Sequence, residues 1–197
     1  MFTGIITDIG EVRAIERRGD TRVTVATRYP IGEIAIGASI ACSGPCLTVV
    51  EKGNDCFAVD ASAETLARST AGAWEQGTRL NLERALKLGD ELGGHLLSGH
   101  VDAVATLVSR RLEGDSLRLV FAVPEPYDRA IAAKGAVAID GVSLTVNEVE
   151  SDRFGVNIIP HTQKETTLGV LQPGDRVNLE IDLIARYLAR LIGKDIG

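Results

Sequence analysis

The sequence predicts an all-β protein made of two copies of one small closed barrel, followed by an amphipathic helix. Residues 41–83 match residues 138–180 without a gap, at a constant offset of 97. Short segments in both copies alternate apolar and polar residues, which is typical of half-buried strands. Near the C-terminus the spacing of apolar residues changes to three and four, which indicates a helix.

The repeat includes glycines, polar residues and core residues alike. A weaker match at an offset of 95 pairs Phe2-Thr3-Gly4 with Leu97-Ser98-Gly99 and puts His100 opposite Ile5. A period near a hundred residues is too long for a solenoid, so it indicates duplication of a whole domain. The clearest matched pairs are Ala41/Ala138, Gly44/Gly141, Leu47/Leu144, Thr48/Thr145, Val49/Val146, Phe57/Phe154, Val59/Val156, Arg79/Arg176, Asn81/Asn178 and Glu83/Glu180.

Alternating segments give each copy about six short strands. They recur at close spacing, with turn signals at Gly53-Asn54 and at Ser151-Asp152. This density of short strands favours a small closed barrel over an α/β sheet. The clearest strand segments are 21–28, 46–62, 78–84, 115–123, 143–159 and 175–181.

Helical segments are expected at the ends of the barrels. Residues 63–70 and 126–135 have the composition of short helices that can plug one open end of a barrel. Residues 181–197 carry an apolar stripe that includes Ile184, Leu188 and Leu191, and no counterpart precedes the second copy. This helix packs back on the chain or joins subunits, and spacing alone does not choose between the two.

The predicted division of the chain is 1–90 for the first barrel, 91–182 for the second and 183–197 for the C-terminal helix. The join carries Gly89, Gly93 and Gly94, which allow the chain to turn between folded units.

Composition is that of a globular protein, with 45% hydrophobic and 24% charged residues over 197 residues. The net charge is −6 and the longest basic runs are pairs of arginines, so nucleic acid is not an expected partner. No apolar segment reaches the length of a membrane span, and the N-terminus lacks the features of a signal peptide. Three cysteines without metal-like spacing favour reduced thiols, and a cytoplasmic location is expected.

The two copies differ in chemistry at a few equivalent positions. The first copy offers a thiol and a carboxylate where the second offers a hydroxyl, a carboxylate and two imidazoles. If the barrels meet face to face, such a site could bind two similar molecules and treat them differently. The divergent pairs are Cys46/Ser143, Ser43/Asp140, Ile5/His100, Glu64/His161 and Ala63/Pro160.

Six motifs in order along the chain together resemble the riboflavin synthase family: MFTG, CLTV, GGHLLSGHVD, IDGVSLTV, IPHTQKETTLG and GDRVNLEID. The resemblance implies two six-stranded Greek-key barrels and a homotrimer assembled through the C-terminal helix. It implies a dismutation in which one 6,7-dimethyl-8-ribityllumazine gives a four-carbon unit to another, yielding riboflavin and 5-amino-6-ribitylamino-uracil. The resemblance implies no metal and no added cofactor. Association with lumazine synthase stays open.

The resemblance also implies two substrate pockets, in a site between the first barrel of one subunit and the second barrel of its neighbour. The first pocket is expected to use Gly4, Ile5, Ile6, Ser39, Cys46, Leu47, Thr48, Asp60, Ala61, Ser62, Ala63, Glu64 and Thr65. The second is expected to use Gly99, His100, Val101, Lys134, Ser143, Leu144, Thr145, Asn157, Ile158, Ile159, Pro160, His161 and Thr162.

Residue types assign roles within this set. His100 is the expected base, because an imidazole titrates near neutrality and the substrate's 7-methyl group must lose a proton. Cys46 is either a nucleophile or a polarisable wall, with an inert buried thiol as the alternative. Ser143 is expected to donate a hydrogen bond, and Ser39 and Asp140 are expected to orient the nucleophile or a water.

Three further residues are weaker site candidates. His161 lies in a pocket stretch, His95 in the linker is expected to be structural, and Asp182 stands where the first copy has Ala85. Pro45, directly before Cys46, is tolerable only at the start of a strand, because proline lacks a backbone donor.

The main alternative function is a non-catalytic protein that binds lumazine or flavin as an antenna. His100, Ser143, Thr145 and Cys46 are all present, which favours the enzyme. A purely structural role is opposed by the unlike polar residues at equivalent positions. A flavin-dependent oxidoreductase is opposed by the lack of a glycine-rich dinucleotide loop after any strand.

Overall fold

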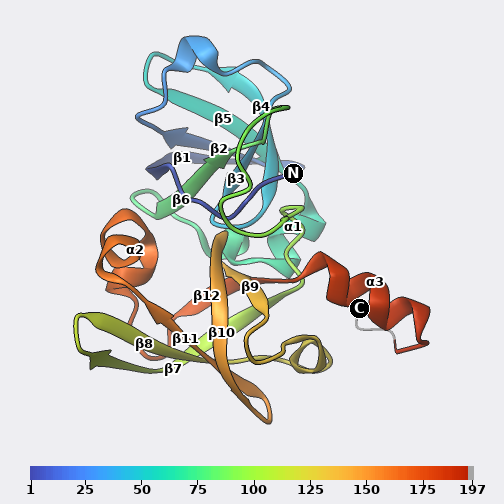
Figure 1. Ribbon diagram of the computed structural model, residues 1–197. Coiled ribbons are helices and arrows are strands. Elements are labelled where there is room, and N and C mark those ends of the chain that lie inside the picture. The colour runs from blue at the N-terminus through green and yellow to red at the C-terminus, as the bar shows by residue number, and fades with distance from the viewer. Residues whose placement is uncertain (195–197) are drawn as a thin grey trace.

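The chain forms two closed antiparallel barrels of six strands each, stacked one on the other (Figure 1). The structure is a computed structural model that describes residues 1–194. The first barrel contains β1 (Asp8–Arg18), β2 (Asp20–Ala26), β3 (Ser39–Cys42), β4 (Cys46–Lys52), β5 (Cys56–Ala61) and β6 (Arg79–Arg84). The second contains β7 (Ala103–Glu113), β8 (Ser116–Ala122), β9 (Ala136–Ile139), β10 (Val142–Glu150), β11 (Arg153–Ile158) and β12 (Arg176–Ile181).

Both barrels share one strand order, which confirms the predicted fold class. The first runs β1-β2-β5-β4-β3-β6 around the ring, and the second runs through the equivalent strands in the same cyclic order. Each barrel encloses its own core, into which the apolar residues of the alternating strands point. Phe57 and Phe154, a matched pair of the repeat, are both fully buried.

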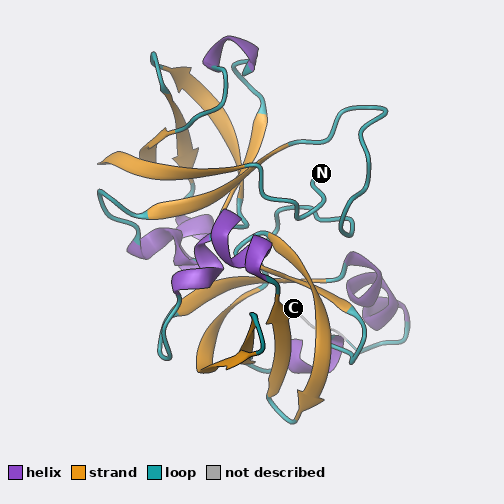
Figure 2. Cartoon of the chain, turned by 60° about the vertical axis from the view of Figure 1, so that its left-hand side comes forward, coloured by secondary structure: helices purple, strands orange, loops and turns teal. Residues whose placement is uncertain are grey.

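Short helices lie at the junction between the barrels (Figures 1 and 2). They are α1 (Ala63–Arg68) with η2 (Thr70–Ala73), and α2 (Pro160–Glu165) with η4 (Thr167–Val170). Ser62 caps α1 by accepting a hydrogen bond from the Thr65 amide at 3.2 Å. Pro160 occupies the first turn of α2, where the missing N–H costs nothing.

Two helical expectations need correction. Over 126–135 only the turn η3 (Tyr127–Ala130) forms, because the next residue, Ile131, adopts an extended backbone with φ −99° and ψ 124°. The C-terminal helix α3 covers Leu183–Leu191, and residues 195–197 of the predicted helix lie outside the described residues. A further turn, η1 (Ile31–Glu33), precedes β3.

Two extended segments cross from one barrel to the other. Phe2 and Leu97 pair in an isolated antiparallel bridge, so residues 2–4 and 97–99 lie side by side. The Glu83 carboxylate holds the first segment, accepting from the amides of Thr3 at 2.7 Å and Gly4 at 2.9 Å. Glu180 holds the second segment in the same way, through Ser98 and Gly99.

The matched asparagines fasten the barrels together at the same junction. Asn81 donates from Nδ2 to the Asp140 carbonyl at 3.0 Å, and its Oδ1 accepts from the Thr167 amide at 2.8 Å. Asn178 mirrors it, donating to the Ser43 carbonyl and accepting from the Thr70 amide, both at 2.7 Å. Four backbone groups, two in each barrel, are therefore satisfied by an asparagine side chain of the other barrel, which fixes the relative orientation of the barrels.

The crossing segments require glycine, and a matched pair of variants tests this. Gly99 has a φ of 76°, and an added Cβ would lie 2.5 Å from the Cys46 Cβ. Gly77 has a φ of 90° with nothing within 4 Å. We expect Gly77→Ala to lower the free energy of unfolding by about 1–2 kcal/mol, from the backbone alone. Gly99→Ala should lower it by at least ~2 kcal/mol more, from the overlap.

Urea titration of both variants measures this difference. Equal losses for the two glycines would contradict a tight crossing at Cys46.

Candidate functional site

A cavity of about 340 Å³ opens where the first barrel meets the crossing segment of the second. Its volume lies in the range of small-molecule sites. Both halves of the chain contribute to it. Its lining residues are Pro45, Cys46, Glu64, Thr65, Arg68, Ser69, Gly99, His100, Val101, Asp102, Tyr127 and Arg186.

Cys46 and His100 meet here because the crossing segment lies against the start of β4. The Cys46 amide donates to the Gly99 carbonyl at 2.8 Å, which adds the segment to the barrel like an extra strand. Alternation along β4 buries Leu47 in the core and leaves Cys46 half-buried on the outer face. The thiol therefore lines the cavity that His100 also lines.

Pro45 does not disturb this arrangement. β4 begins at Cys46, so the proline stands just before the strand, and its carbonyl accepts from the Cys42 amide at 2.9 Å. Cys42 itself is fully buried, and burial raises the pKa of its thiol above the ordinary value. Cys46 is thus the accessible thiol of this hairpin.

An ion pair between the buried Asp102 and the half-buried Arg186 ties α3 to the cavity. The Asp102 carboxylate contacts Arg186 of α3 at 2.8 and 2.9 Å and also accepts from the Ile181 amide at 2.9 Å. Burial raises the pKa of Asp102, and these hydrogen bonds oppose the rise. Asp102 follows His100 by two residues, so the pair fixes the end of the crossing segment.

Sequence reasoning missed five residues of this cavity: Arg68, Ser69, Asp102, Tyr127 and Arg186. Arg68 pairs with Glu64 one helical turn earlier, at 2.9 Å, which is a spacing the sequence displays. Arg186 pairs with a residue 84 positions away, and no local pattern indicates such a contact. Each of the two arginines is paired with a carboxylate of the same lining, Arg68 with Glu64 and Arg186 with Asp102.

Only part of the 60–65 stretch reaches the cavity. Glu64 and Thr65 line it, whereas Ala61 is buried in the barrel core. Asp60 is held by Arg22 on the neighbouring strand at 2.9 Å. Ser62 and Ala63 are exposed at the start of α1.

The crossing exchanges the expected membership of the two pockets. The Ser143 amide donates to the Gly4 carbonyl at 2.9 Å, so Gly4, Ile5 and Ile6 lie beside the second barrel. Gly99, His100 and Val101 lie beside Cys46 instead. Assignment of each entry segment to its own barrel was therefore wrong, because each segment is anchored by its own glutamate but crosses to the opposite strand.

The alternation along each strand divides the remaining expected strand residues into those that point into a barrel core and those that lie on the outer face. Leu47, Leu144, Ala61 and Ile158 point into the barrel cores, so only their backbone is available to a ligand. Thr48 and Thr145 are exposed on the outer face, and Ser39 lies opposite Thr48 in the β3–β4 register. These residues continue the outer surface from which Cys46 and Ser143 project.

The later expected residues lie around β11 and α2. Asn157 carries a buried Oδ1 without a partner in the described chain. Ile159, Pro160 and His161 are exposed, and Thr162 is half-buried in α2. Lys134 is exposed at the turn beside β10, where its amide donates to the Val146 carbonyl at 2.8 Å.

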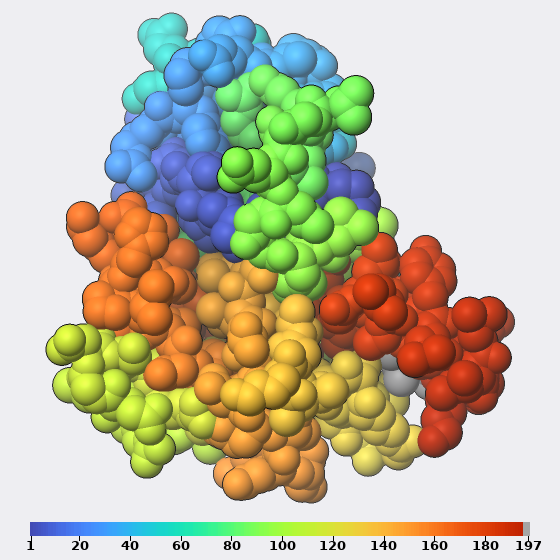
Figure 3. Space-filling model, viewed as in Figure 1, coloured from blue at the N-terminus to red at the C-terminus, as the bar shows by residue number. Residues whose placement is uncertain are grey.

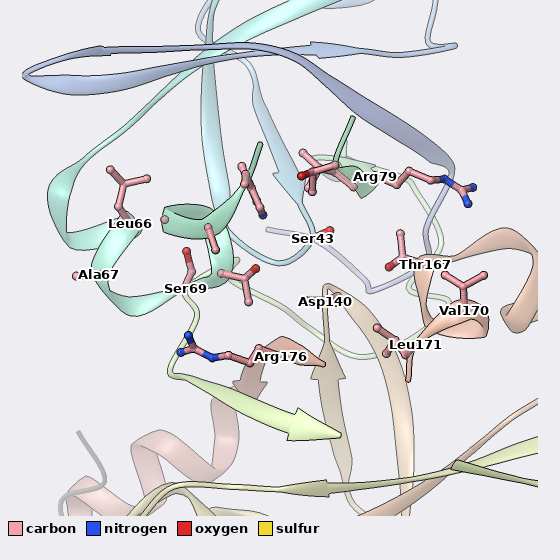
Figure 4. A pocket seen from close by; sticks show the side chains of 16 residues that line it. Ser43, Leu66, Ala67, Ser69, Arg79, Asp140, Thr167, Val170, Leu171 and Arg176 are labelled. Atoms are coloured by element: carbon pink, nitrogen blue, oxygen red, sulfur yellow. The ribbon is translucent and has the colours of Figure 1, made fainter. Parts of the chain in front are cut away.

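Asp140 is not among the residues that line the cavity of Cys46 and His100. Ser43 and Asp140 both line a second cavity, of about 630 Å³, between the barrels (Figure 4). Each is the first residue of a hairpin turn with two positive φ values, Ser43-Gly44 and Asp140-Gly141, as type I′ turns require. The Asp140 Oδ1 accepts from the Asn178 amide at 2.8 Å, and burial raises its pKa to about 7.

Asp182 also has a structural explanation. Its Oδ1 accepts from the Ile184 amide at 2.8 Å and so caps α3. Among residues 1–194 no cluster of histidine, cysteine or acidic side chains could hold a metal ion. The same described part of the chain contains no helix of the length and apolarity that crossing a membrane demands.

Comparison with known proteins agrees with this geometry. A model of the lumazine binding domain matches the chain twice, over residues 3–85 and 98–182. A riboflavin synthase of Brucella abortus is 50% identical over 97% of this chain and 98% of its own. A riboflavin synthase of Photobacterium phosphoreum is 41% identical over 98% of this chain and 89% of its own.

The chain belongs to the riboflavin synthase family. Among solved structures, LumP complexed with riboflavin is similar, with a TM-score of 0.84 and 27% identity over 92% of this chain and 99% of that chain. LumP complexed with 6,7-dimethyl-8-(1'-D-ribityl) lumazine matches with a TM-score of 0.82. The riboflavin synthase fold therefore spans the whole described barrel pair.

The buried Asp140 carboxyl should make the free energy of unfolding depend on pH. Its raised pKa means that the protonated form stabilises the fold; this contribution is full below the unfolded-state pKa near 3.8 and is lost as pH rises to about 7. Asp140→Asn cannot ionise. Between pH about 5 and about 8, the unfolding free energy of the wild type should fall by about 2–3 kcal/mol relative to Asp140→Asn.

Urea unfolding at four pH values checks this difference. Ser43→Ala, at the matched turn, should keep the pH dependence of the wild type. Parallel curves for wild type and Asp140→Asn would contradict the assigned environment.

Proposed function

We propose that this chain catalyses the dismutation of 6,7-dimethyl-8-ribityllumazine to riboflavin and 5-amino-6-ribitylamino-uracil. One observation carries the proposal: the crossing of the duplicated halves, which puts a thiol and an imidazole of a riboflavin synthase family member into one cavity of ligand size. The reaction needs no oxidant, because the four-carbon unit that one lumazine loses is the unit that the other gains.

His100 is the proposed base. It is exposed at the cavity mouth, where its ring is free to take the proton of a substrate methyl group. Its backbone is fixed, since its amide donates to Ser98 Oγ at 3.3 Å and Ser98 is held by Glu180. A base that is mobile only about its side-chain torsions suits transfer of a proton from a bound ring.

Cys46 and Ser143 are the proposed polar groups of the two half-sites. Each projects from the first residues of an equivalent strand, and each has a glycine carbonyl of the crossing segment bonded to its amide. The thiol is the group of the pair able to add to an electron-poor ring carbon and leave again. The Ser143 hydroxyl can donate or accept at the same place on the second molecule.

The remaining expected pocket residues are proposed to surround these groups. Glu64, Thr65 and Val101 belong to the Cys46 half-site, and Gly4, Ile5 and Ile6 to the Ser143 half-site. Ser39, Thr48, Lys134, Thr145 and the 157–162 stretch are proposed to contact the ring edge or the ribityl chain. The antenna function is the second candidate, since a LumP structure with the same lumazine is similar to this chain.

Assembly into a homotrimer is part of the proposal. α3 projects from the body of the molecule (Figures 1 and 3) and exposes Ile184, Leu188 and Leu191 to 76%, 55% and 84%. Three apolar side chains on one helix face are unusual on a monomer and suit burial against a second copy. We also propose a cytoplasmic location and a division of the chain at residues 90 and 182.

The direct test is an anaerobic incubation of the purified protein with 6,7-dimethyl-8-ribityllumazine and no cofactor. Riboflavin should appear at half the amount of lumazine consumed. Tight binding of lumazine without riboflavin would overturn the enzyme and support the antenna function.

His100→Gln should lower kcat by about 10²–10⁴-fold, because glutamine keeps hydrogen bonding but cannot take the proton. The same variant should bind lumazine within a few fold of wild type and unfold at the same temperature. A variant that retained wild-type kcat would remove His100 from the proposed mechanism.

Leu188→Glu on α3 should dissociate the assembly, because it would bury a charge at the proposed interface. Sedimentation of the wild type should give three times the chain mass of 20.9 kDa, and the variant should give one. Leu112→Glu, at a leucine 75% exposed on β7, is the matched control and should leave the mass unchanged. A wild type that sediments as a monomer would refute the trimer.

A further inference from the structure

The linker between the barrels covers the Ser143 half-site. In Figure 3 it lies across the face of the molecule and over the N-terminal segment. The His95 amide donates to the Thr3 carbonyl at 3.2 Å, which holds the linker on the crossing segment. Gly94 lies so close that an added Cβ would be 2.7 Å from the Ser143 Cβ. The linker is therefore packed directly onto this serine.

The His95 side chain contacts the serine hydroxyl. Nδ1 lies 2.6 Å from Ser143 Oγ, a short hydrogen bond. Burial lowers the pKa of His95, with the nearby Asp182 charge opposing the change, so the imidazole is neutral near pH 7. In a neutral imidazole one ring nitrogen donates and the other accepts, and with either tautomer the bond at Nδ1 restrains the orientation of the serine hydroxyl.

The other ring nitrogen has no partner. His95 Nε2 is buried and makes no hydrogen bond within the described residues. A buried polar atom left unpaired costs free energy, so the fold keeps this imidazole in place at the expense of one unsatisfied group. Such a cost is typical of a position selected for something other than stability.

The equivalent residue of the first copy is held differently. Cys46 lines an open cavity, and within residues 1–194 no imidazole nitrogen hydrogen-bonds its sulfur. The duplicated half-sites thus differ in the residue itself and in whether an imidazole restrains it.

We propose that His95 is a positioning residue that fixes the Ser143 hydroxyl and so makes the second half-site treat its lumazine differently from the first. This inference rests on the proposed function and deepens it. A hydroxyl with one fixed orientation favours one polar edge of a bound ring. The Cys46 half-site, without this restraint, leaves its sulfur free for the reacting carbon.

The test uses two variants, each of which places a side-chain amide near the position of one of the two imidazole nitrogens. Asparagine places its amide near Nδ1 of the replaced imidazole, whereas glutamine reaches toward Nε2. We expect His95→Ala to lower kcat roughly tenfold, His95→Asn to restore most of it, and His95→Gln to restore little. Equal activities of the asparagine and glutamine variants would overturn the proposed role of Nδ1.

A double-mutant cycle with Ser143→Ala tests whether His95 acts through the serine. The loss caused by His95→Ala should shrink to less than about twofold in the Ser143→Ala background, because coupled residues are not additive. The same loss in both backgrounds would show a general structural role and refute the proposal. Thermal unfolding of each variant separates loss of folding from loss of positioning.

Lumazine binding, followed by its fluorescence, separates this inference from the proposed function. His95→Ala should weaken one class of sites and leave the other unchanged, whether or not riboflavin is formed. If the wild type makes no riboflavin but this selective weakening is seen, the dismutation fails and the positioning role stands. Equal weakening of both classes, or of neither, refutes the positioning role even in an active enzyme.

Discussion

Two buried carboxylates hold together everything that makes the site. Glu83 and Glu180 each accept two backbone amides and a hydroxyl from the segment that enters their barrel. Burial raises the pKa of both carboxyls, and the hydrogen bonds to the segments offset part of this cost. Charge-assisted bonds of this kind are about twice as strong as neutral ones, so they can hold an otherwise irregular strand in register. Without these anchors, neither His100 nor Ile5 would be fixed beside the opposite barrel.

Duplication gave the molecule a symmetric frame with an asymmetric interior. The anchors, the asparagine pair and the glycines of the crossing are the same in both halves, because each does a structural job that both halves need. The residues that differ lie outside these shared anchoring contacts: Cys46 corresponds to Ser143, and Ser43 corresponds to Asp140. The second difference lies at the barrel junction, so the two copies diverge both at this junction and beside the cavity of Cys46 and His100.

Much of the fold was predictable from the sequence, because the repeat and the strand alternation are local patterns. The site was only partly predictable. Cys46, Glu64, Thr65, Gly99, His100 and Val101 do share one cavity. The exchange of entry segments was not predictable, since an alternating pattern does not say which barrel a segment joins. Arg186 and Asp102 meet through tertiary packing alone. Asp140-Gly141 carried a readable signal, because Asp-Gly is a preferred pair for a two-residue hairpin turn.

The Arg186–Asp102 pair has a consequence for how the protein responds to dilution. Docking of α3 and order at the end of the crossing segment share one partly buried contact, so they are thermodynamically linked. The coupling is reciprocal: the free energy by which helix docking favours ligand binding in the cavity equals the free energy by which bound ligand favours helix docking. If other copies of the chain hold this helix, substrate and neighbouring subunits each raise the affinity for the other. At protein concentrations low enough for the helix to dissociate from its neighbours, ligand affinity then falls before the barrels unfold.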